Sequence, residues 1–346
     1  MAIRDLVQAP ACIEAWFDRF YDEGDRRLLL YLNDGPREAE ALLAALGMER
    51  AELLRAWQRG VLDWDNRNRI GPADFHIRFD YWAMFEGWKD LPDSLRTELK
   101  RWELESYYAS HIADLEAVRR NRAPFPERII PRYLLLDESL EVLERVDRIY
   151  LWPCNCRSML GNCNKPVFTC LRFDNARDLG WEISREKAAE LIREANAAGL
   201  MQSGELGLDA EGRLSGAICN CCADCCFPHR MAEAFQAEKL WPRSRYLAKP
   251  DPALCTGCGR CLRRCPFQAL TRNTADKEAS PEILVAEALC RGCGLCATGC
   301  PEQAIAMRRL EIGPGWELRD LLPHTGPGPD RGQKIVESAA VYESKT

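Results

Sequence analysis

The sequence predicts an α+β protein with three folded parts: a mainly helical N-terminal domain, a small α/β cysteine-rich middle domain, and a C-terminal module organised by cysteines. Two observations predict this division. More than half of the Trp, Tyr and Phe residues lie within the first 110 positions, whereas all but one of the 18 cysteines lie between Cys154 and Cys300. The predicted boundaries are 1–130, 131–248 and 249–312, followed by a flexible tail at 313–346.

The N-terminal domain is expected to be a helical, winged-helix-like domain with a core of aromatic residues. Leu42 and Leu46 line one face of a first helix, and Gly47 ends it before a second helix begins. One further long and highly charged helix is predicted at 91–120. His76 has no partner at metal-ligand spacing in the sequence, so we expect it to be structural.

The polar stretch at 63–69 has the place of the hairpin in a winged helix, which raises DNA binding as an alternative. The charge argues against that alternative. Residues 1–150 contain 22 Lys or Arg and 29 Asp or Glu, a net charge of −7, and the remainder carries +1. Nucleic-acid-binding domains are typically basic. We therefore favour a helical docking or scaffold module and expect no nucleic acid partner.

The cysteines are expected to meet a reducing environment. No run of 18 apolar residues is present, so we expect no membrane span. The N-terminal segment carries Glu14, Asp18 and Asp22 where a signal peptide has an apolar core. These features favour a cytoplasmic location, in which cysteines bind metals rather than form disulfides. The sequence does not predict the oligomeric state.

In the middle domain, a helix and a hairpin are predicted between two groups of cysteines. A strand at 148–152 leads into the first group. Ser184 is a favourable N-cap for the helix that follows, and Gly199 is a natural stop. The sequence pattern at 200–219 predicts two strands around a turn at 209–212. We expect this arrangement to bring the two cysteine groups together.

The strongest signal is a repeated motif, C-x2-C-x2-C-x3-C-P, which is the spacing with which bacterial proteins bind [4Fe–4S] clusters. Two intervening residues let a tight loop direct successive sulfurs at one cluster. Gly257 and Gly292 keep backbone amides close enough to donate to the cluster sulfides. The two copies contain Cys255, Cys258, Cys261 and Cys265, and then Cys290, Cys293, Cys296 and Cys300.

In both motifs, residues 250–310 resemble the bacterial two-[4Fe–4S] ferredoxins, which implies a ferredoxin-like fold. In that family the fourth cysteine of each run binds the other cluster. The resemblance therefore implies one cluster on Cys255, Cys258, Cys261 and Cys300, and another on Cys290, Cys293, Cys296 and Cys265. Two zinc knuckles of four thiolates each are the alternative, but such knuckles rarely use three cysteines at successive x2 spacing.

Nine further cysteines are candidate metal ligands in the middle domain: Cys154, Cys156, Cys163, Cys170, Cys219, Cys221, Cys222, Cys225 and Cys226. Cys219, Cys222 and Cys225 repeat the C-x2-C-x2-C frame, so we hypothesise a third iron–sulfur cluster with a fourth ligand from the first group. Other combinations of these cysteines are equally compatible with the spacing. If all nine bind metal, they would suffice for two four-thiol clusters and leave one thiol over. A single structural zinc joining the two groups is the alternative. His229 is expected to be a surface or capping histidine.

Over residues 135–310 the chain resembles a family of cysteine-rich 4Fe–4S-binding proteins. The shared pattern is a Pro-Cys-x-Cys-Arg segment, a helix with a hairpin, a Cys-Asn-Cys-Cys-x-x-Cys-Cys segment, and a two-cluster ferredoxin module. The resemblance implies redox work in anaerobic or facultative metabolism and specifies no substrate.

Three functions follow, of which we favour the first. An electron-transfer protein would pass low-potential single electrons to or from a redox partner protein. An oxidoreductase, specifically an iron–sulfur reductase, would use the middle cysteines as its active site, so the sequence leaves open whether the chain is an enzyme. A redox-sensing regulator is opposed by the acidic N-terminal domain. No Walker loop, G-x-G-x-x-G after a strand, or C-x-x-C-H motif supports nucleotide or haem binding.

Overall fold

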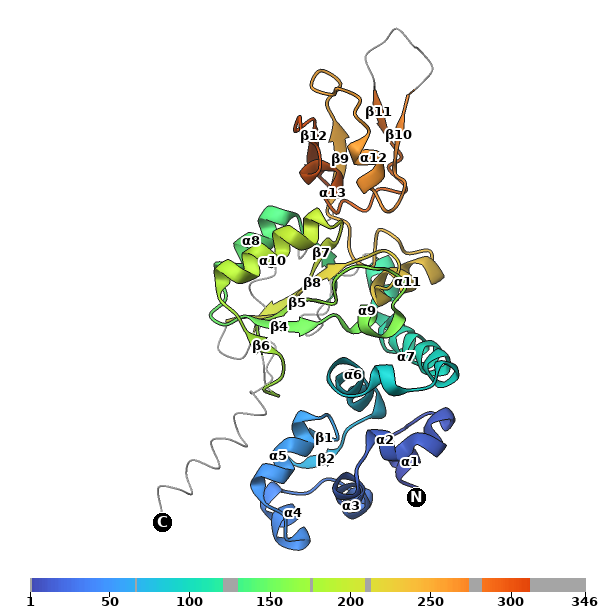
Figure 1. Ribbon diagram of the computed structural model, residues 1–346, viewed down its shortest axis with the longest axis vertical. Helices are drawn as coiled ribbons and strands as arrows, with labels where there is room; N and C mark the ends of the chain where they lie inside the picture. Colours follow the sequence, from blue (N-terminus) through green and yellow to red (C-terminus); the bar gives the residue numbers. More distant parts are fainter. Residues whose placement is uncertain are drawn as a thin grey trace. The chain divides into compact units, whose positions relative to one another are not determined.

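The structure is a computed structural model that describes residues 2–65, 67–120, 130–174, 177–208, 213–273 and 282–311. The chain forms two compact units (Figure 1). Unit 1 contains the residues up to Ala109 and a short segment ending at Leu179, and unit 2 contains the parts that carry the cysteine motifs. The division falls within helix α7 (Asp93–Arg119), ahead of the predicted boundary near residue 130. The tail predicted at 313–346 lies outside the described residues.

Unit 1 is mainly helical. Its further helices and strands are α1 (Ile3–Leu6), α2 (Phe17–Phe20), α3 (Glu23–Tyr31), α4 (Ala39–Leu46), α5 (Arg50–Gln58), β1 (Leu62–Trp64), β2 (Ile70–Pro72) and α6 (Phe75–Phe85). The predicted helix pair is confirmed as α4 and α5, and Gly47 ends α4 in the left-handed conformation. The long helix predicted at 91–120 is α7. Strands β1 and β2 form a small antiparallel hairpin that includes the predicted polar stretch.

His76 of α6 has partners that the sequence did not indicate. Its ring lies 3.1 Å from the carboxylate of the buried Glu103 and 3.9 Å from that of Asp80. Burial alone lowers the pKa of His76, but the carboxylate of Glu103, which accepts a hydrogen bond from the ring, and the charge of Asp80 outweigh it and raise the pKa to about 9. The three side chains also have the proximity of a metal site, but a proton held on the ring competes with a metal ion. We therefore interpret them as an ion-paired cluster.

This pairing predicts a pH-dependent stability of unit 1. Because the pKa of His76 is higher in the folded chain than its ordinary value of 6.5, the stabilisation is complete below pH 6.5. It is lost as the pH rises through about 9. Urea unfolding followed by tryptophan fluorescence should show a falling midpoint over this range, and His76→Gln should remove the dependence. A dependence that survives unchanged in His76→Gln would contradict the assignment.

Unit 2 contains an antiparallel sheet of six strands in the order β3-β7-β8-β5-β4-β6. The strands are β3 (Arg132–Tyr133), β4 (Tyr150–Pro153), β5 (Phe168–Arg172), β6 (Trp181–Glu182), β7 (Met201–Leu208) and β8 (Leu214–Cys221). The predicted hairpin is confirmed as β7 and β8, while its turn at 209–212 lies outside the described residues. The mixture of helices and sheet agrees with the predicted α+β class.

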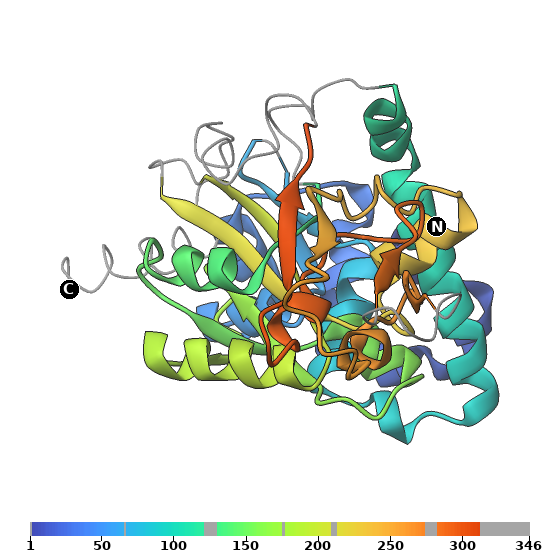
Figure 2. The same ribbon diagram turned by 90° about the horizontal axis from the view of Figure 1, so that it is seen from above.

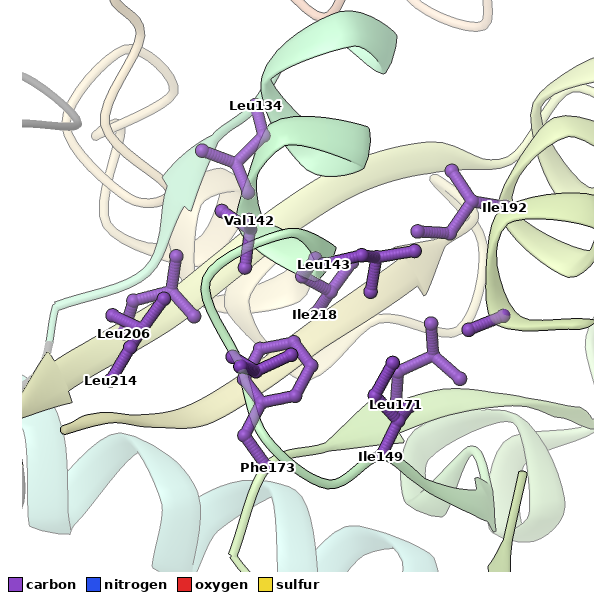
Figure 3. Packing of buried hydrophobic residues seen from close by; sticks show 12 residues of the cluster. Leu134, Val142, Leu143, Ile149, Leu171, Phe173, Ile192, Leu206, Leu214 and Ile218 are labelled. Carbon is purple, nitrogen blue, oxygen red and sulfur yellow. The ribbon is translucent and has the colours of Figure 1, made fainter. Parts of the chain in front are cut away.

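Helices α8 (Leu136–Leu143) and α10 (Arg185–Ala197) lie side by side over one face of this sheet (Figure 2). Figure 3 shows the core between these helices and the sheet, where Val142 and Ile192 of the helices face Leu171 and Ile218 of neighbouring strands. Side chains alternate along a strand. Cys170 and Cys219, the next residues along from the Leu171–Ile218 pair, therefore lie on the opposite face.

Ile218 is fully buried at the centre of this core. Ile218→Ala should lower the free energy of unfolding by about 2–5 kcal/mol because it leaves a cavity, whereas Ile218→Val should cost about 0.5–1.5 kcal/mol. Chemical denaturation without oxygen, followed by far-ultraviolet circular dichroism, measures both. Equal effects of the two substitutions would contradict tight packing at this position.

Three further elements of unit 2 are α9 (Asn155–Leu160), α11 (Phe227–Ala234) and the strand β9 (Tyr246–Pro250). The part of the chain that contains the two cysteine motifs forms α12 (Arg260–Arg264), β10 (Leu270–Arg272), β11 (Ile283–Val285), α13 (Leu295–Thr298) and β12 (Ile305–Arg309). Strand β9 pairs with β12, and β10 pairs with β11, both antiparallel. None of the helices in the described ranges has the length and apolarity of a membrane span.

Candidate metal centres

Two pockets in the C-terminal part of unit 2 gather the eight motif cysteines. The lining of the first pocket includes Cys255, Cys258, Cys261 and Cys300. The lining of the second pocket includes Cys265, Cys290, Cys293 and Cys296. Each pocket thus combines three cysteines of one run with the fourth cysteine of the other run. Four cysteines that line one pocket fit a thiolate-bound cluster.

Equivalent backbone contacts hold the fourth cysteine of each run. The N–H of Ala269 donates to the sulfur of Cys265 at 3.4 Å, and the N–H of Ala304 donates to Cys300 at 3.3 Å. Such hydrogen bonds orient the sulfur and stabilise its negative charge. Burial raises the pKa of the Cys293 thiol to about 12, so this sulfur becomes a thiolate at neutral pH only when a cation binds it.

Gly292 is required by the backbone of the second pocket. It has a φ of +71°, and a Cβ added there would lie 2.1 Å from the carbonyl oxygen of Tyr246. The loop between Cys290 and Cys293 therefore packs directly against the backbone of β9. Any larger residue would displace this loop and the sulfurs on either side.

The nine cysteines of the middle domain fall into two sets. The three-thiol set is Cys163, Cys222 and Cys225, whose sulfurs all lie within 4.8 Å of one another. The six-thiol set is a chain of neighbouring thiols in the order Cys154, Cys156, Cys226, Cys221, Cys219 and Cys170. The hypothesised frame of Cys219, Cys222 and Cys225 is therefore divided between the two sets.

The sheet explains this division. Cys219 and Cys221 alternate with Asn220 along β8, so their side chains share one face of the sheet. Cys170 of the neighbouring strand β5 lies on the same face. Cys222 follows the end of β8, where the chain has already turned away. Within the six-thiol set, the hydrogen bond from Cys219 lowers the pKa of Cys221 to about 6.

Arg157 is a buried cation between these sets, with 2% of its surface exposed. Its guanidinium donates to the hydroxyl of Thr169 at 2.6 Å and to the carbonyl of Pro166 at 2.7 Å. It also donates to the sulfur of Cys222. Hydrogen bonds from Cys225, which have the largest effect, and from Arg157 lower the pKa of Cys222 to about 5. Arg157 is therefore a buried partner of these thiols rather than a solvated surface charge.

His229 is buried, so the expectation of a surface or capping histidine is wrong. Its ring lies 3.3 Å from the hydroxyl of Tyr133 and stacks on Phe267 with ring centres 5.6 Å apart. Burial lowers the pKa of His229 to about 3, so the ring is neutral. Tyr133 belongs to the same buried cluster as Cys293 of the second pocket. Burial, with Cys293 and Cys226 nearby, raises the pKa of its hydroxyl. Tyr133 therefore lies near both the second pocket and the six-thiol set.

Comparison with protein families identifies part of the chain. Residues 254–305 match the model of the 4Fe-4S dicluster domain, and this range contains all eight cysteines of the two pockets. This part of the chain is therefore a ferredoxin-type 4Fe–4S module that binds iron and sulfur. A search of curated proteins finds no match to the chain.

The position of Gly292 predicts a selective loss of iron. Gly292→Ala should lower the iron and acid-labile sulfide of the module by about half, because the second pocket opens while the first is unchanged. Gly259→Ala is the matched control, since Gly259 has a φ of +69° and an added Cβ would approach only the side-chain end of Arg272, at 3.3 Å. Equal iron contents in the two variants after anaerobic reconstitution would contradict the backbone clash.

Proposed function

We propose that this protein transfers single electrons through two [4Fe–4S] clusters of the ferredoxin-type module. The cysteines of the first pocket would bind one cluster and those of the second pocket the other. When bound, such clusters accept and release one electron at a time at low potential. The observation that carries the proposal is the crossed composition of the two pockets, since each contains three cysteines of one run and the fourth of the other.

The exposure of the cysteines supports a direction of exchange. Cys258 of the first pocket is exposed, whereas Cys290, Cys293 and Cys296 of the second pocket are buried. Beside Cys255, 53% of the Leu254 side chain is exposed. An exposed apolar side chain beside an accessible cluster is suited to a transient protein contact. We therefore propose that a redox partner protein docks at the first pocket.

The second pocket is joined firmly to the middle domain. Arg264 donates to the carbonyl oxygens of Leu295 at 2.8 Å and Asn196 at 2.9 Å, so it connects the module to the end of α10. The hydroxyl of Thr298 also contacts the side chain of Asn196, at 2.8 Å. Rigid packing of this kind keeps the distance between redox centres constant. It supports a relay in which the six-thiol set binds a further iron–sulfur cluster.

The aromatic contacts support the same relay. Tyr133 and His229 are both buried and in contact with each other, and Tyr133 lies near Cys293 and Cys226. Because His229 is neutral and Tyr133 keeps its proton, neither side chain adds a charge that would change with pH. Electrons would pass from the partner to the first pocket, then to the second, and then to the six-thiol set.

A reductase is the second candidate, and the size of the six-thiol set favours it. Six neighbouring thiols exceed the four that one cubane cluster requires. Surplus thiols next to a cluster are suited to ligand exchange with a substrate. Turnover of a substrate by the purified protein, with only an artificial electron donor, would favour this candidate over the carrier.

Reductive titration tests the electron-transfer proposal. Protein purified without oxygen should accept about two electrons in the module at low potential, and its electron paramagnetic resonance spectrum should show two interacting clusters. The reduced protein should pass these electrons to an artificial one-electron acceptor. A chain that takes up no electrons from a strong reductant, despite bound metal, would refute the proposal.

The crossed ligation predicts which cluster each fourth cysteine supports. Cys265→Ser should remove about four iron atoms and leave the same spectrum as Cys293→Ser, although Cys265 belongs to the run of Cys258. Cys258→Ser should instead remove the cluster of the first pocket and leave the spectrum of the cluster in the second pocket. Cys12→Ser, which lies outside both runs, is the control and should retain all the iron. If Cys265→Ser leaves the same spectrum as Cys258→Ser, the ligation is not crossed.

A further inference from the structure

The sulfur separations in the three-thiol set match a single metal ion. The sulfur of Cys163 lies 3.5 Å from that of Cys222 and 3.7 Å from that of Cys225. A tetrahedral ion with metal–sulfur bonds of about 2.3 Å places its ligand sulfurs about 3.8 Å apart. A cubane cluster attaches each cysteine to a different iron and so needs wider separations. The geometry therefore favours one ion over a cluster at this set.

Each of the three sulfurs is already oriented as a ligand by a backbone amide. The N–H of Cys225 donates to Cys222 at 3.3 Å. The N–H groups of Lys165 and Asn162 donate to Cys163 and Cys225, respectively. Amides directed at sulfur fix its position and stabilise the thiolate, as partners of metal ligands do. The loop after α9 and the turn after β8 are thus both shaped around these sulfurs.

The charges balance for one divalent ion. Three thiolates and a divalent cation together carry a charge of −1. The buried guanidinium of Arg157, which donates to Cys222, carries +1 and is fixed by its bonds to the backbone and to Thr169. The assembly is therefore neutral, as burial requires. A fourth thiolate from the chain, buried beside these three, would leave an uncompensated negative charge, whereas a thiolate that binds from solvent would remain partly hydrated.

The three thiols leave the fourth position of a tetrahedral ion to a ligand from outside the set. Within the described part of the chain, no further Cys, His, Asp or Glu joins the three thiols at ligand distance. Gly161, Asn162, Asn164 and Asp224, which flank the three cysteines, are all exposed. Zinc sites with three protein ligands complete their shell with water or with an exchangeable ligand.

We propose that Cys163, Cys222 and Cys225 bind one Zn²⁺ ion whose fourth ligand is a water molecule that a small thiol can displace. Soft thiolate ligands in a tetrahedral arrangement select zinc among the common divalent ions. This site is separate from the six-thiol set and from both pockets of the ferredoxin-type module. It therefore lies outside the proposed electron path and does not depend on it.

Metal analysis of the full chain, produced without oxygen, tests the proposal. We expect one zinc ion per chain in addition to iron. Cys163→Ser and Cys225→Ser should lose the zinc and keep the iron. Cys170→Ser, in the six-thiol set, is the matched control and should keep the zinc. Loss of iron with Cys163→Ser, or a wild-type chain with iron but no zinc, would overturn the assignment.

X-ray absorption at the zinc edge tests the coordination without any substitution. The spectrum should fit three sulfurs at about 2.3 Å and one oxygen at about 2.0–2.2 Å. Addition of 2-mercaptoethanol should convert this shell to four sulfurs. A shell of four sulfurs before the thiol is added would refute the open position. Failure of the electron-transfer proposal would instead appear as missing iron and leave the zinc spectrum unchanged.

Discussion

Each pocket of the ferredoxin-type module takes its fourth cysteine from the other half of the module, and the rest of unit 2 depends on this exchange. Neither half can complete a four-thiol site alone. The antiparallel pairing of β9 with β12 holds the two halves in register. Because each run supplies cysteines to both pockets, the two halves must be folded against each other before either site is complete.

The same constraint reaches the middle domain through a few buried polar groups. Arg264 directly precedes Cys265, and it holds the end of α10 through the backbone of Asn196. On the other side, Arg245 and Tyr246 at the start of β9 both donate to Glu138 of α8. These bonds fix the second pocket against the helices that cover the sheet. The sheet carries the six-thiol set on its opposite face, so the sites of unit 2 share one rigid frame.

Features with a local cause could be predicted from the sequence. The C-x2-C-x2-C spacing is a property of one tight loop, and it indicated the motif cysteines without any knowledge of the fold. The N-cap at Ser184, which accepts from the N–H of Lys187 at 3.2 Å, and the stop at Gly199 likewise defined α10. The matched family covers this local part of the chain.

Features with a long-range cause could not be predicted. The division of the middle cysteines follows from the pairing of β5 with β8, which places Cys170 beside Cys219 and leaves Cys222 to meet Cys163. Motif spacing alone grouped Cys219 with Cys222. The burial of His229 and the pairing of His76 with Glu103 likewise arise from contacts between distant segments. One sequence carries no direct signal for such contacts.

Native mass spectrometry of the chain, purified and sprayed without oxygen, tests the central claim most directly. The crossed pockets predict a mass increase that includes two intact [4Fe–4S] clusters. Mass from zinc ions alone, with no inorganic sulfide, would mean that the eight motif cysteines form zinc knuckles. That result would contradict the electron-transfer account.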